Sequence, residues 1–73
     1  MEKRIQYVKY SMSCKAIERS EDLIGINIYS LNAGTLDAIE YVESVLGLEV
    51  KGLLKVYEEL DQEPITTQNT HII

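Results

Sequence analysis

Apolar side chains recur at every second position in two stretches near the N-terminus. In residues 4–14 they lie at Val8, Tyr10, Met12 and Cys14. In residues 23–31 they lie at Ile24, Ile26 and Ile28. A period of two with β-branched residues is typical of half-buried strands. Residues 4–31 therefore predict a β-hairpin, and residues 13–22 are compatible with strand, helix or turn.

A different period begins at Thr35. From there to the end of the central segment, apolar side chains follow at steps of three or four residues, at Ile39, Val42, Leu46, Val50, Leu53, Tyr57 and Leu60. Such steps place side chains on one face of a helix, and the charged residues between them suit the solvated face. We therefore predict a helical segment over residues 35–61. Its core or dimer face is formed by Ile39, Val42, Leu46, Val50, Leu53 and Leu60.

Capping and breaking residues mark the ends of this segment. Thr35 is a good N-cap, and Pro64 disfavours a helical conformation in the residue before it. Gly47 is compatible with a C-cap between helices at 35–46 and 49–61, or with the interior of one bent helix. An interior glycine costs about 1 kcal/mol relative to alanine, and one helix would contain Gly47 and Gly52. Two helices are therefore favoured.

The C-terminal residues 62–73 mix strand-forming and polar residues, which predicts either an extra edge strand or a frayed end. With the hairpin at 4–31 and the helical segment at 35–61, the expected fold class is α+β. The chain forms a single small domain over residues 1–73 in the order ββαα, with the hairpin packed against the helical segment.

The chain is small but rich in apolar residues. It has 73 residues, of which 45% are hydrophobic and 26% charged. A domain of this size buries a limited fraction of its surface, and association is one common remedy. We therefore expect a homodimer. The single cysteine, and the absence of a signal-peptide pattern and of a long apolar run, predict a cytoplasmic protein that does not enter a membrane.

Charge is divided unequally along the chain. Residues 1–19 carry five basic and two acidic side chains, whereas residues 20–73 carry two basic and ten acidic ones. An acidic face is most simply a solvated face, but it can also bind a basic partner protein. The candidate partner-binding residues are Glu49, Tyr57, Glu58, Glu59, Asp61 and Glu63.

The basic residues of the N-terminal segment suggest two alternative functions. Contacts to an anion would come from Arg4, Lys9, Lys15 and Arg19. One alternative is a small transcriptional regulator that binds DNA through the basic hairpin, because phosphate contacts dominate DNA affinity. The other is a small protein that sequesters an anionic ligand or nucleotide.

No catalytic, cofactor or metal site is expected. Cys14 is predicted to be a core residue and His71 a structural one, and the four glycines match no phosphate-binding loop. Tyr7 and Tyr29 are placed to meet across the hairpin. We therefore expect a non-enzymatic acidic protein that binds and regulates or inhibits a partner protein. Its general profile is similar to that of small acidic inhibitors carried by phages, although no motif supports that similarity.

Overall fold

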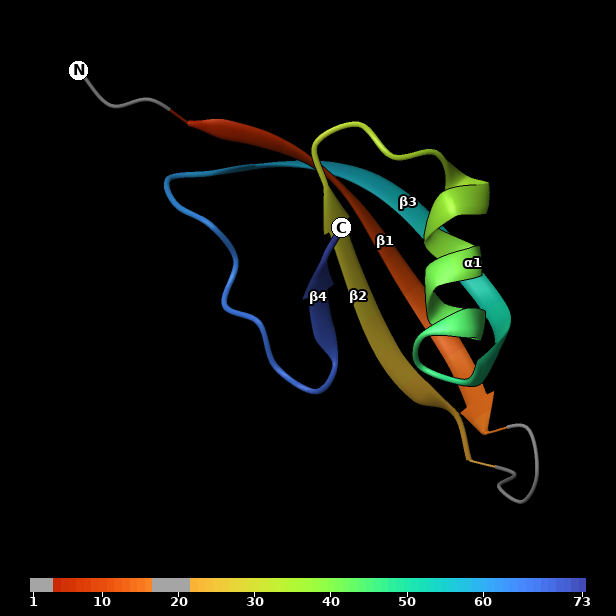
Figure 1. Ribbon diagram of the computed structural model, residues 1–73. Coiled ribbons are helices and arrows are strands. Elements are labelled where there is room, and N and C mark those ends of the chain that lie inside the picture. The colour runs from red at the N-terminus through yellow and green to blue at the C-terminus, as the bar shows by residue number, and fades with distance from the viewer. Residues whose placement is uncertain (1–3, 17–21) are drawn as a thin grey trace.

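The computed structural model describes residues 4–16 and 22–73, which form a four-stranded mixed sheet with one helix (Figure 1). The elements in chain order are β1 (Ile5–Ala16), β2 (Ile24–Ser30), α1 (Thr35–Ser44), β3 (Leu48–Leu60) and β4 (Thr70–Ile72). The strand order is β3-β1-β2-β4, with β1 antiparallel to both β2 and β3, and β4 parallel to β2. The expected α+β class is confirmed, but the ββαα order is not.

The predicted hairpin is present, and its alternating pattern selects the buried face. Val8, Tyr10, Met12 and Cys14 are all buried on β1. On β2 the same face carries the buried side chains of Ile26 and Ile28, which lie opposite Met12 and Tyr10. These residues form the core between the sheet and α1. The part of the ambiguous segment 13–22 that lies in residues 13–16 is strand, and residues 17–21 lie outside the described residues.

Helix α1 begins at Thr35, as predicted for the first helix, and ends two residues earlier, at Ser44 rather than at Leu46. Gly34, rather than Thr35, is the N-cap, and its backbone N–H donates to Oδ2 of Asp37 at 3.4 Å. Ala38 and Val42, one turn apart, are fully buried against the sheet. The helix ends at Ser44, and Gly47 has a φ of 69°, in the left-handed region that glycine favours. Gly47 therefore lies in the turn that leads into β3.

The prediction of a second helix at 49–61 is wrong, and so is the alternative of a single bent helix. Residues 48–60 form the 13-residue strand β3. Its pairing with β1 is interrupted by a bulge, because Ser13 lies opposite Gly52 whereas Cys14 lies opposite Val50. Lys51 is the extra residue. Because of the bulge, Val50 and Leu53 both pack against the core although they are three positions apart. A spacing of three is also the spacing of residues on one face of a helix, which is why the sequence predicted a helix here.

Five of the six predicted core-face residues reach the core. Val42 is buried, and those packed against the core while partly exposed are Ile39, Leu46, Val50 and Leu53. Leu60 does not belong to this set. Leu60 pairs with Ile5 and lies on the opposite face of the sheet, because it is three positions, an odd number, beyond Tyr57 in a regular strand.

The C-terminal segment provides the fourth strand, so the edge-strand alternative is confirmed. Residues 61–69 run from β3 at one edge of the sheet to β4 at the other, away from α1 (Figure 1). The N–H of Asn27 donates to the carbonyl of Asn69 at 2.7 Å, and the N–H of Ile73 donates to the carbonyl of Tyr29 at 2.9 Å. In the part of the chain that the structure describes, no helix is long and apolar enough to cross a membrane.

Candidate protein-binding surface

Acidic residues gather where β3 ends and the following segment begins. We call residues 57–65 the acidic surface: they contain the carboxylates of Glu58, Glu59, Asp61 and Glu63, and no lysine or arginine. Five of the six predicted partner-binding residues fall within this range. The sixth, Glu49, lies ten residues before Glu59, which is roughly 33 Å along an extended strand. Glu49 therefore belongs to the other end of the molecule, where its carboxylate lies 3.2 Å from Nζ of Lys51.

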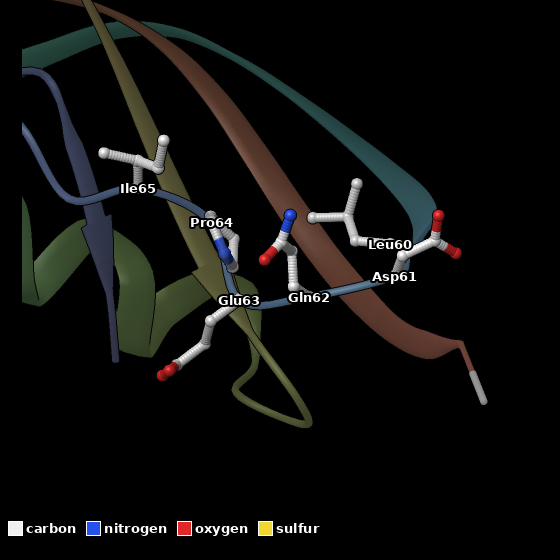
Figure 2. Close-up of a pocket in the computed structure, with 6 residues that line it drawn as sticks. All are labelled: Leu60, Asp61, Gln62, Glu63, Pro64 and Ile65. Atoms are coloured by element: carbon white, nitrogen blue, oxygen red, sulfur yellow. The ribbon is translucent and has the colours of Figure 1, made fainter. Parts of the chain in front are cut away.

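The sheet sets the position of the acidic surface. The end of β3 pairs only with the start of β1, with Ile5 opposite Leu60, because the β1–β2 pairing begins further along, at Val8. A turn and Pro64 then lead the chain away from the strand. Residues 60–65 line an open hollow of about 410 Å³, shown in Figure 2. Ile65 lies in this lining and is 83% exposed. The surface therefore combines carboxylates with uncovered apolar area.

The four carboxylates have different surroundings. Oδ1 of Asp61 lies 3.3 Å from Nε of Arg4, and both side chains are more than half exposed, so this ion pair contributes under about 1 kcal/mol. Glu58 accepts a hydrogen bond from the hydroxyl of Tyr29 at 2.8 Å. Glu59 and Glu63 are exposed and make no ion pair with residues 4–16 or 22–73. These two carboxylates are the ones best placed to bind a basic group.

Glu58 belongs to a cluster on the sheet face opposite α1. The rings of Tyr7 and Tyr29 meet edge to face, with centroids 5.8 Å apart and an interplanar angle of 86°, so the predicted contact between them is confirmed. Nζ of Lys9 lies 5.6 Å from the centroid of the Tyr29 ring. Burial and the hydrogen bond to Glu58 raise the pKa of Tyr29, while the charge of Lys9 opposes that rise. These contacts fix the Glu58 side chain against the sheet.

Uncovered apolar side chains continue from the acidic surface along β3. Leu54, which is 63% exposed, lies with Val56 on the sheet face away from α1, and Tyr57, which is 66% exposed, lies on the other face. Nζ of Lys55 lies 5.7 Å from the centroid of the Tyr57 ring. Large apolar groups left in solvent beside charged residues are typical of interaction sites. The exposure of Leu54, Val56 and Ile65 was not predicted from the sequence, because the first two fall in the predicted helical segment and Ile65 in the C-terminal tail.

The structure does not gather the predicted anion-binding residues. Arg4 pairs with Asp61, and Lys9 lies over Tyr29 in the middle of β1. Lys15 lies roughly 35 Å from Arg4 along the strand, opposite the acidic Glu49. Arg19 lies outside the described residues. The three predicted anion-binding residues that the structure describes, Arg4, Lys9 and Lys15, therefore form no common site.

Cys14 and His71 occupy structural positions. Cys14 is fully buried, and burial raises the pKa of its thiol, which disfavours the nucleophilic thiolate. Nε2 of His71 donates to the carbonyl of Gln68 at 3.0 Å, since a carbonyl can only accept; Nδ1 then accepts from the hydroxyl of Tyr41 at 3.3 Å. Among residues 4–16 and 22–73, no three His, Cys, Asp or Glu side chains could together hold a metal ion.

Comparisons of this chain with protein-family models, curated proteins and solved structures found no match.

Proposed function

We propose that this chain is a non-enzymatic protein that binds a partner protein through the acidic surface and regulates or inhibits it by covering part of its surface. One observation carries the proposal: residues 57–65 hold four carboxylates and no basic residue, and they include the exposed apolar side chains of Tyr57 and Ile65. A negative field around uncovered apolar groups complements a protein surface rich in lysine and arginine.

The two parts of the acidic surface have separate roles in this proposal. Glu59 and Glu63 accept charge-assisted hydrogen bonds from the partner's arginine or lysine side chains. Tyr57 and Ile65 supply apolar contact area, and tyrosine is enriched in protein interfaces. Glu58, already held by Tyr29, contributes its charge without the entropic cost of becoming ordered. The open hollow at residues 60–65 can receive a side chain of the partner.

The sign of the charge favours a protein partner over a nucleic acid. Nucleic-acid affinity depends on neutralising phosphates with lysine and arginine, and a surface of four carboxylates repels phosphate. Of the basic residues that could offset this effect, Arg4, Lys9 and Lys15 are described by the structure, and they lie apart from one another. The expected partner is therefore a protein with a basic surface.

A variant of the segment beyond β3 tests this function. Glu63→Gln combined with Ile65→Ala removes one exposed carboxylate and one exposed apolar side chain. The matched control, Glu43→Gln with Leu36→Ala, makes the same changes on α1, where both residues are also exposed. The immobilised full chain is used to retain partner proteins from a cell lysate, and these are identified. The affinity of each retained protein for the natural chain, the variant and the control is then measured at low and high salt.

We expect a basic protein whose affinity falls about tenfold in the Glu63/Ile65 variant, stays unchanged in the control, and decreases with salt. Retained proteins that bind the variant and the control equally well would contradict the role of the acidic surface.

A further inference from the structure

Strand β3 is a long edge strand. In the described part of the chain it pairs with β1 on one side only, since the strand order begins at β3. An edge leaves backbone N–H and C=O groups without a ladder partner, and natural proteins usually shorten, charge or cover such edges. Here the edge has 13 residues, and the half that ends at Leu60 extends beyond α1 in Figure 1. This half also carries the exposed side chains of Leu54 and Tyr57.

We propose that this half of β3 pairs antiparallel with the same strand of a second copy of the chain, about a two-fold axis at Tyr57. The two four-stranded sheets then join into one continuous sheet. The dimer uses Tyr57 and Glu59 of the acidic surface for contact with the second copy and leaves Glu63 and Ile65, which lie beyond the paired residues, for the partner protein. Because the test of the proposed function changes only Glu63 and Ile65, the two proposals can fail separately.

Symmetry restricts how the two strands can align. Antiparallel strands of identical chains are related by an axis perpendicular to the sheet, so each residue lies opposite one on the same face. With the axis at Tyr57, Lys55 lies opposite Glu59 of the second copy, and Leu54 lies opposite Leu60 of the second copy. The first pair lies on the face that carries Tyr10, and the second lies on the other face. Each contact occurs twice in the dimer.

Charge selects this alignment from its neighbours. An axis at Lys55 or at Glu58 would place that charged residue opposite itself, and like charges directly opposite destabilise a sheet. An axis at Val56 would place Leu54 opposite Glu58 of the second copy and Leu53 opposite Glu59 of the second copy. An axis at Tyr57 instead forms two Lys–Glu pairs and two Leu–Leu pairs. The paired residues 54–60 also avoid the bulge at Lys51.

The alignment accounts for features that are costly in a single copy. It covers Leu54 and Tyr57, which are 63% and 66% exposed, and it gives ladder partners to the free side of the strand. The alignment also places the apolar Val56 of the second copy opposite Glu58. The Glu58 carboxylate tolerates this neighbour because it already accepts a hydrogen bond from Tyr29. The acidic segments that follow Leu60 lie at the two ends of the paired region and stay accessible.

Opposite charge reversals test the alignment. Lys55→Glu makes the dimer pair glutamate with glutamate, and Glu59→Lys makes it pair lysine with lysine. Each change should raise the dimer dissociation constant about tenfold or more. An equimolar mixture of the two variants restores both Lys–Glu pairs in a heterodimer. Glu43→Lys, an equal charge change at an exposed position on α1, is the control.

The measurement is light scattering with sedimentation equilibrium across micromolar concentrations. The natural chain and the control should show twice the chain mass of 8.3 kDa, each variant alone should show the single mass, and their mixture should show the doubled mass again. A natural chain that stays monomeric throughout overturns the proposal. A dimer that neither variant weakens, or a mixture that stays monomeric, overturns the pairing of Lys55 with Glu59.

Discussion

At the scale of single residues, the alternating pattern identified the buried face of β1 correctly. Val8, Tyr10, Met12 and Cys14 are buried because they share one face of a strand that lies at the centre of the sheet. Tyr7, on the other face, is also almost fully buried, at 3% exposure. Its contact with Tyr29 was predictable from the hairpin, but its burial was not, because the sequence gives no sign of what covers the second face.

Tyr29 should make stability fall at alkaline pH. Its pKa is raised in the folded state, so the unfolded chain loses this proton at a lower pH than the folded one. Tyr29 therefore makes a contribution to folding stability that is fully present below about pH 10, the ordinary pKa of tyrosine. This contribution is lost as the pH rises through the folded-state pKa. Urea unfolding of the natural chain and of Tyr29→Phe should show the difference, with the natural chain losing more stability above that pH. Equal losses in both proteins would show that Tyr29 does not titrate in this way.

At the scale of elements, β3 shows why an apolar period can mislead. Val50, Leu53 and Tyr57 follow helical spacing, yet all three lie on the α1 side of a strand, because Lys51 is an extra residue in the ladder. The alternation of apolar and polar residues from Leu48 to Lys51 is typical of a strand, but it spans only four residues within the longer helical period on which the prediction rested. By contrast, α1 and the turn at Gly47 were predictable, because their signals come from neighbouring residues.

Deletion of Lys51 should leave β3 nearly as stable as before. The deletion removes the bulge and keeps Val50 and Leu53 on the core side, so we expect a loss under about 1 kcal/mol, largely from the exposed pair with Glu49. Deletion of Lys55, the matched control, reverses the facing of the strand on one side of the gap and should cost at least about 2 kcal/mol. Chemical unfolding of both deletions measures these losses. Equal losses would show that Lys51 is not the extra residue.

At the scale of the whole molecule, the sequence predicted which residues are acidic better than it predicted where these residues lie. The acidic residues were identifiable because charge is a property of composition, but Glu49 was wrongly grouped with them. Ten residues rise about 15 Å in a helix and about 33 Å in a strand, so the error about β3 became an error about the surface. The strand order was not predictable, since β4 pairs with β2 through three residue pairs far apart in the chain.

Amide hydrogen exchange along residues 54–60, followed by NMR as the protein concentration rises, tests the central claim most directly. If β3 is an edge strand that pairs with a second copy, alternate amides exchange rapidly in dilute solution, because their N–H groups face solvent. All of these amides become protected once the dimer forms. Uniform protection at every concentration, with the short contacts between residues three apart that mark a helix, would contradict the strand. Alternating protection that never changes with concentration would contradict its pairing with a second copy.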